Sequence, residues 1–269
     1  MNDAEAPDKP SVAGMYDCYL GGTANSLADR AAVERMRQVS PDVIDGAWAN
    51  RGFLQRAVKR MATEWGIRQF LDIGAGLPTQ RNTHEVVADA VADGRVVYVD
   101  IDPRVIARGR EILAGVDGTA VILGDVRQPG KILGHPDTQR LIDFGEPVGL
   151  LLVAVMQFVP DADDPWGVVA SYVDAVASGS YLALSAVTAD RQAERIVDAG
   201  RKVYASTTTP ATTRTKAEIE RLFAGLEVVP PYEGADPVVT YVGQWGAEDP
   251  QAADSDGSRW FYAAVARKP

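Results

Sequence analysis

The apolar residues follow two rhythms, which divide the chain into a helical first quarter and a longer alternating part. From Ser11 to Trp65 they recur at helical spacing. Ser40-Pro41, a capping residue followed by proline at the first helical position, predicts a helix start, and Gly21-Gly22 predicts a turn. We therefore expect helices joined by turns over this quarter. The plainest apolar stripe consists of Leu54, Ala57, Val58, Met61 and Trp65.

Beyond Trp65, short runs of β-branched and aliphatic residues alternate with stretches long enough to hold a crossover helix. The run from Val148 to Val155 is apolar on both faces, as expected for a central parallel strand that helices cover on both sides. The alternation predicts an α/β fold with a doubly wound, mostly parallel sheet. The runs are Gln69 to Ile73, Arg95 to Val99, Ala120 to Leu123, Val148 to Val155 and Tyr181 to Ala186.

The last third of the chain adds elements of both kinds. Ala189 to Tyr204 has a helical pattern, and a capping box opens a second helix over Thr215 to Phe223. Leu226 to Val229 and Trp260 to Ala266 are strand-like, which brings the predicted sheet to seven strands.

The predicted sheet also sets the domain organisation. Gly243 to Ser258 is acidic and punctuated by Gly and Pro, so we expect a loop between the last strands. Because the sheet needs those strands, residues 67–269 are predicted to form one domain that cannot be divided. Residues 1–66 are predicted to be a disordered start followed by a helical cap or lid on that domain.

Composition narrows the class of function. The 269 residues carry a formal net charge of −10, which repels phosphate backbones, so we expect no nucleic-acid partner. With one cysteine, Cys18, and two histidines, the chain lacks the ligands of a Cys/His zinc site, and we expect no metal and a reducing, cytoplasmic setting. The acidic N-terminus does not resemble a signal peptide. The longest apolar run, Val148 to Met156, is far shorter than the ~20 residues that span a bilayer, so we expect no membrane association.

The strand from Phe70 ends in a glycine motif, Asp72-Ile73-Gly74-Ala75-Gly76. Glycines at such a turn let the backbone pass close under a ligand. A dinucleotide fingerprint would have a third glycine where this chain has Thr79, and an apolar residue in place of Asp72. An acid two residues before Gly-x-Gly suits a ligand with an ammonium group and no pyrophosphate. S-adenosylmethionine is the common metabolite of that description.

Acids also follow the next two predicted strands. Asp100 comes 24 residues after Gly76, close to the ~20 expected for a carboxylate that binds ribose hydroxyls. Asp102, before Pro103, is placed to cap a helix. Asp125 ends the third strand, so its carboxylate can lie on the same rim and accept from an adenine amine. The predicted cofactor-binding residues are Asp72, Gly74, Ala75, Gly76, Asp100, Ile101, Asp125, Val126 and Ala154.

In this order the motifs resemble a class I S-adenosylmethionine-dependent methyltransferase. More narrowly, the opening block from Pro10 to Asp17, with Leu20-Gly21-Gly22, Asn25 and Ala28-Asp29-Arg30, resembles a bacterial family of such enzymes formerly catalogued as of unknown function. The resemblance covers nearly the whole chain. It implies that Asp72 and the glycines line the methionine part, Asp100 the ribose, and Asp125 with Val126 the adenine. The family often has histidine where this chain has Gln157.

Three residues are candidates to face the transferred methyl group, namely Tyr16, Gln157 and His84. The opening block that contains Tyr16 is either a lid that closes over the cofactor or a helix pair that packs on the sheet. His84 follows Asn82-Thr83, a helix-capping pair, so it is either a surface histidine in a first helical turn or a catalytic group. Asp161, Asp163 and Asp164 are either a magnesium cluster or, with Pro165, the start of a helix.

These observations predict an S-adenosylmethionine-dependent methyltransferase that acts on a small molecule. The sulfonium already activates the methyl group, so the protein has to align it with an acceptor and exclude water. Two alternatives remain open: a regulatory protein that binds the cofactor without catalysis, and a nicotinamide-dependent oxidoreductase. The sequence determines neither the acceptor nor the oligomeric state.

Overall fold

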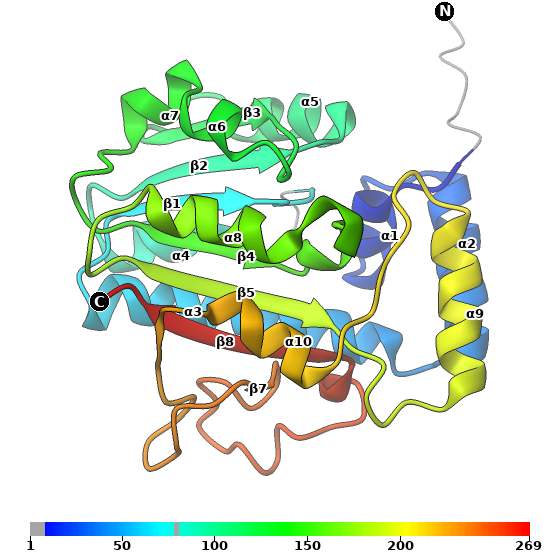
Figure 1. Cartoon of the computed structure of the whole chain (residues 1–269). Coiled ribbons are helices and arrows are strands. Elements are labelled where there is room, and N and C mark those ends of the chain that lie inside the picture. The colour runs from blue at the N-terminus through cyan, green and yellow to red at the C-terminus, as the bar shows by residue number, and fades with distance from the viewer. Residues whose placement is uncertain (1–8, 78–80) are drawn as a thin grey trace, which may run out of the picture.

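The computed structural model describes residues 9–77 and 81–269, and over these residues an eight-stranded sheet forms the centre of the molecule (Figure 1). Its first five strands are parallel, and β8 runs antiparallel to β5, between β5 and the short edge strand β6. This confirms the predicted doubly wound, mostly parallel fold. In spatial order the strands are β3 (Thr119–Leu123), β2 (Arg95–Asp100), β1 (Gln69–Ile73), β4 (Gly149–Val153), β5 (Tyr181–Val187), β8 (Phe261–Arg267) and β6 (Glu227–Val228).

The strand that raises the count from seven to eight is β7 (Thr240–Tyr241), which pairs with β8 through Thr240 and Ala263. Two residues are too few to show the alternation of apolar and polar positions that marks a strand, so the sequence pattern did not predict β7. The predicted disordered start falls mainly on residues 1–8, which lie outside the described residues, as does Thr79.

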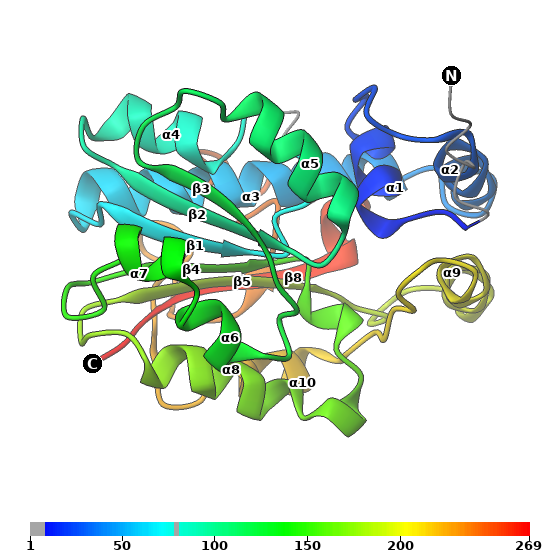
Figure 2. The ribbon, with the colours of Figure 1, turned by 90° about the horizontal axis from the view of Figure 1, so that it is seen from above.

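Helices cover both faces of the sheet (Figure 2). On one face lie α3 (Val43–Glu64), α4 (Thr83–Ala90) and α5 (Pro103–Ile112). The other face is covered by α6 (Pro129–Leu133), α7 (Pro136–Leu141), α8 (Pro165–Asp174) and α10 (Lys216–Glu220).

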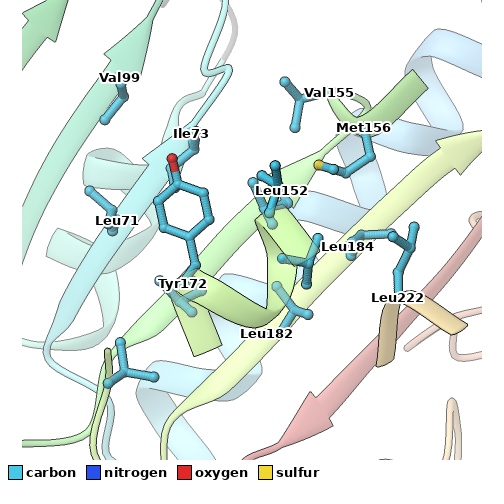
Figure 3. Close-up of a cluster of buried hydrophobic side chains, with 14 of the residues drawn as sticks. Leu71, Ile73, Val99, Leu152, Val155, Met156, Tyr172, Leu182, Leu184 and Leu222 are labelled. Carbon is cyan, nitrogen blue, oxygen red and sulfur yellow. The ribbon is translucent and has the colours of Figure 1, made fainter. Parts of the chain in front are cut away.

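Alternate strand residues pack into these two layers, because successive side chains of a strand point to opposite faces. Phe70 packs with α3 and α4, whereas its neighbour Leu71 packs on the α8 side. Figure 3 shows that second layer, in which Tyr172 of α8 lies over aliphatic side chains from four strands. Burial on both faces explains why the strands read as continuous apolar runs.

Three helices stand apart from these layers, beyond the carboxyl ends of the parallel strands (Figures 1 and 2). They are α1 (Val12–Tyr19), α2 (Leu27–Val39) and α9 (Glu194–Ala205). Met15, Met36 and Val203 share a small apolar core there. We call these three helices the cap helices; α9 comes from the second half of the chain. None of the described helices is long and apolar enough to cross a membrane.

Two helix starts differ from the sequence prediction. Ser40 does not cap α3; its N–H donates to Met36 O at 2.8 Å and closes α2, and α3 begins at Val43. The helix expected from Ala189 begins only at Glu194, because Arg191 adopts a left-handed φ of 62° that interrupts helical geometry.

Candidate active site

The loop after β1 turns sharply at two glycines. Gly74 and Gly76 have φ values of 75° and 66°, in the left-handed region that favours glycine. A Cβ on Gly74 would collide with the side chain of Val155. The N–H groups of Gly74 and Ala75 donate to Val99 O at 2.8 and 3.1 Å. The loop therefore crosses the end of β2 at residues without a side chain, Gly74 and Gly76, which allows a ligand to approach the backbone closely.

Asp100 fixes this loop from the end of β2. Its Oδ2 accepts the N–H of Gly76 at 2.9 Å and its Oδ1 accepts the N–H of Asp102 at 2.9 Å. The side chain is buried, and this burial raises the pKa of its carboxyl. Asp102 caps α5 by accepting the N–H of Arg104 at 2.9 Å, as its place before Pro103 predicted.

Asp72, the acid of the glycine motif, is buried at the end of β1. Its Oδ2 accepts a hydrogen bond of 2.6 Å from the hydroxyl of Thr83, at the start of α4. Burial raises the pKa of Asp72 to about 6, against the opposing effects of the Thr83 hydroxyl and the Arg51 guanidinium. A cation bound beside this carboxylate would favour its ionised form.

Asp125 lies at the end of β3 and has a strong protein partner. Both of its oxygens accept hydrogen bonds from Arg127, the shortest at 2.6 Å, and Arg127 also pairs with Asp163 at 3.0 Å. Hydrogen bonding to Arg127 holds the pKa of Asp125 below its ordinary value. The backbone N–H of Arg127 also donates to Oδ1 at 2.9 Å, so each carboxylate oxygen accepts from two N–H groups of Arg127.

The acidic cluster after β4 serves the fold. Arg214 pairs with Asp161 at 2.7 Å, and Asp163 is bound by Arg127. Asp164 caps α8 by accepting the N–H of Gly167 at 3.1 Å. This arrangement supports the helix start over the magnesium cluster.

The strand ends and the cap helices line a cavity of about 590 Å³. This volume is typical of sites for small molecules and cofactors. Tyr16 and Gln157 also line it, whereas His84 does not. The lining includes all nine predicted cofactor residues, Asp72, Gly74, Ala75, Gly76, Asp100, Ile101, Asp125, Val126 and Ala154.

Tyr16 is held in the cavity wall by a buried polar chain. Its hydroxyl donates to Ala47 O at 3.2 Å and accepts from Asn50 Nδ2 at 2.9 Å. Asn50 Oδ1 accepts from the Ser185 hydroxyl at 2.5 Å, and Ser185 Oγ accepts the N–H of Ala154 at 3.0 Å. Burial raises the pKa of Tyr16, so its phenol stays protonated at neutral pH. These hydrogen bonds connect Tyr16 of α1 to the ends of β4 and β5.

Gln157 lies in a 3₁₀ turn, Met156–Phe158, that follows β4. Its side-chain Nε2 donates to Ala154 O at 2.8 Å, and its backbone carbonyl accepts the N–H of Thr212 at 2.7 Å. Ala154 has a left-handed φ of 55°, an unfavourable conformation for a residue with a Cβ. Such local strain is frequent where a strand ends at a functional site.

His84 lies in the first turn of α4, as its sequence position predicted, and faces Tyr98. Its N–H donates to Tyr98 Oη at 2.7 Å, and its Nδ1 is 2.8 Å from the same oxygen. Partial burial lowers the pKa of the imidazole. The structure therefore brings Tyr16 and Gln157 to one cavity and leaves His84 outside it.

The opening block has a structural task. Asp17 Oδ2 accepts from Ala24 N at 2.9 Å and from Asn25 Nδ2 at 2.8 Å, which holds the turn between α1 and α2. Asp29 Oδ1 accepts the N–H of Ser11 at 2.7 Å. These residues fix the position of α1, which carries Tyr16.

Arg51 also lines the cavity, although the sequence motifs did not predict it. Arg51 lies on α3 and is 4% exposed, yet it forms no hydrogen bond or ion pair with any residue that the structure describes. A signal was available, since Arg51 precedes Leu54 and Val58 by three and seven residues and so falls on the apolar stripe. A charge on a buried stripe indicates a partner that is not part of the stripe.

Comparison with known proteins identifies the relatives of the chain. A model of the S-adenosyl methyltransferase family matches residues 3–269. A candidate methyltransferase from Thermobifida fusca YX is 41% identical, with a TM-score of 0.88 over 97% of this chain and 95% of that one. A DUF574 family protein from Streptomyces avermitilis MA-4680 is 36% identical, with a TM-score of 0.89 over 97% of this chain and 98% of that one.

More distant matches concern the fold alone. An O-methyltransferase family 2 protein from Planctomyces limnophilus DSM 3776 is 16% identical, with a TM-score of 0.50 over 91% of this chain and 67% of that one. No curated protein matches the chain.

The family match covers nearly the whole chain and confirms the resemblance that the motifs indicated. It also supports a methyltransferase that uses S-adenosylmethionine as its cofactor, over the nicotinamide-dependent alternative. The chain belongs to the S-adenosyl methyltransferase family.

Proposed function

We propose that this enzyme transfers the methyl group of S-adenosylmethionine to a small-molecule acceptor inside the cavity of about 590 Å³. The observation that carries the proposal is the two-sided lining of this cavity. The predicted cofactor residues form its wall at the strand ends. On the other side, α1, α2 and α9 enclose a space lined by apolar and aromatic side chains, including Tyr19, Met36, Val197 and Tyr204.

The cofactor residues are assigned by their chemistry. Asp72 accepts from the α-ammonium of the methionine part, and the bare backbone at Gly74 and Gly76 lets the cofactor lie close to β1. Asp100 accepts from both ribose hydroxyls, because each of its oxygens has a lone pair beyond the backbone bond it already accepts. Asp125 accepts from the adenine amine, which shares the carboxylate oxygens with Arg127. The bound cofactor supplies a methyl group that its sulfonium has already activated.

The cap supports a small acceptor. Thr208 N donates to Pro10 O at 3.2 Å, so the segment after α9 is joined to the chain two residues before the start of α1. The acceptor space is therefore bounded by chain on several sides, and the enclosure excludes water from the transferred methyl group. A folded macromolecule would have to present a thin side chain to enter it.

The two candidates that line the cavity align the acceptor; they do not remove its proton. The Tyr16 hydroxyl donates its proton to Ala47 O, and burial raises its pKa. The amide of Gln157 has no basic group. The described lining residues include no histidine. This favours an acceptor that is nucleophilic when it binds, such as a thiolate or an uncharged amine.

The proposal is tested with S-adenosylmethionine carrying a labelled methyl group. Enzyme and label are incubated with a cell extract, and label is counted in the low-molecular-mass, protein and nucleic-acid fractions. We expect transfer to the low-molecular-mass fraction, and no transfer by Asp100→Ala. Label in protein or nucleic acid would contradict the small-molecule acceptor. The matched control is Asp93→Asn, which changes an exposed acid outside the cavity.

A further inference from the structure

Arg51 is a buried cation without a partner among the described residues. It is 4% exposed, and its Nε is fully enclosed with no hydrogen-bond partner. Removing a guanidinium from water without pairing it costs several kcal/mol, so proteins pair almost every buried charge. The neighbouring arginine of the same helix, Arg56, shows the ordinary pattern, because it donates to carbonyl oxygens of Val242 and Trp245.

The unpaired part of Arg51 faces the cavity. The residue lines the cavity, and its two terminal nitrogens, unlike Nε, are not fully enclosed. The ring of Tyr16 lies over the guanidinium, 5.7 Å from Cζ, so an aromatic face covers one side of the cation. The two terminal NH₂ groups that remain form a fork suited to a carboxylate.

An acidic residue, Asp72, lies within electrostatic range of Arg51 but forms no ion pair with it. Asp72 lies close enough for the guanidinium to lower the pKa of its carboxyl, yet the two side chains form no ion pair. Asp72 instead accepts from Thr83. The same cavity is therefore lined by a buried guanidinium and a buried carboxyl group within electrostatic range of each other, each with bonding capacity left.

We propose that Arg51 binds the α-carboxylate of the methionine part of S-adenosylmethionine, while Asp72 binds its α-ammonium. This rests on the proposed function, in which the cofactor occupies this cavity. A zwitterion satisfies both charges at once. A carboxylate on the methyl acceptor would pair with Arg51 but would leave Asp72 without its cation.

The test compares two ligands by titration calorimetry. They are S-adenosylhomocysteine and its decarboxylated analogue, which keeps the ammonium group, the thioether and the adenosine. The wild type should bind S-adenosylhomocysteine roughly 10- to 100-fold more tightly than the analogue. In Arg51→Met, this preference should fall below about threefold, because only the carboxylate ligand loses a contact. Arg51→Lys should retain part of the preference.

Arg201→Met is the matched control, since Arg201 lines the cavity but is exposed and lies near Asp198 at 3.7 Å. It should keep the full preference for the carboxylate ligand. Equal loss of both ligands in Arg51→Met, or no loss of either, would overturn the assignment. If Arg51→Met does not fold, the wild-type comparison decides: equal affinity for the two ligands overturns it. Failure of the wild type to bind S-adenosylhomocysteine at all would instead refute the proposed function.

Discussion

Gly76 donates its backbone N–H to Asp100 Oδ2 at 2.9 Å, which joins the glycine loop after β1 to the end of β2. Oδ1 of the same carboxylate accepts the N–H of Asp102 at 2.9 Å. Each oxygen thus binds the backbone on one side and has a lone pair left for the cavity that Asp100 lines. One carboxylate therefore shapes the loop and offers acceptors to a ribose.

Asp100→Asn should weaken the binding of S-adenosylhomocysteine about 100-fold, because the amide nitrogen replaces one acceptor with a donor that faces a backbone N–H. Titration calorimetry measures the affinity. Asp93→Asn, at an exposed acid paired with Arg68, is the control and should bind as the wild type does. An unchanged affinity in Asp100→Asn would remove Asp100 from the cofactor site.

The predicted cofactor-binding residues could be found from sequence because the patterns that mark them are local. Asp72, Asp100 and Asp125 each stand at the end of an apolar run that predicts a strand. The carboxyl ends of parallel strands lie at the same edge of the sheet. The caps at Asp102 and Thr215 are equally local, since each depends on residues two or three positions away. Their positions followed from short-range rules.

What the sequence did not predict depends on packing between distant segments. The position of Arg51 on the apolar stripe of α3 is local, but the cavity that Arg51 lines is formed by distant segments. Likewise, α9 joins the other cap helices through contacts such as that of Val203 with Met36. His84 was placed in its helix turn correctly, but its direction is set by Tyr98, a residue of β2. No local pattern contains these relationships.

The binding of S-adenosylhomocysteine should depend on pH through Asp72. Burial raises the pKa of this carboxyl to about 6, and the ionised form is the one that pairs with an ammonium group. We expect affinity to be constant above about pH 7 and to fall by up to about tenfold per unit as the pH drops below about 6. Calorimetry across this range measures the slope. The same slope in Asp72→Asn would show that another group is responsible.

Asp72 should also affect the stability of the free enzyme, with a definite sign. Its folded pKa of about 6 exceeds the unfolded value of ~3.9, so the folded state binds more protons between these values. Its contribution is complete below about pH 4 and is lost as the pH rises through about 6. The Tm of Asp72→Asn, relative to wild type, should therefore increase over this range. Thermal unfolding measures the difference, and a difference that does not change with pH contradicts the prediction.

Tyr16→Phe separates a structural hydroxyl from a catalytic one. The change leaves Asn50 Nδ2 without its acceptor, so we expect a loss of about 1–3 kcal/mol in the free energy of unfolding. Methyl transfer to the acceptor recovered by labelling should fall less than about tenfold, with an unchanged pH profile. Loss of a general base would cost about 10²- to 10⁴-fold and would alter that profile. Urea unfolding and initial rates distinguish the two outcomes.

Arg214 holds the turn that carries Gln157, and its two kinds of partner can be separated. The guanidinium is 2% exposed and donates to the carbonyl oxygens of Met156 and Val159 at 2.7 and 2.6 Å, as well as to Asp161. Asp161 is mostly exposed, so water can replace its partner, whereas the enclosed carbonyls have no such substitute. Arg214→Met should therefore lower the free energy of unfolding by about 3 kcal/mol or more, and Asp161→Asn by about 1 kcal/mol or less. Urea unfolding of both variants is the measurement. Equal losses would mean that the ion pair, and not the carbonyl contacts, holds the turn beneath the acceptor space.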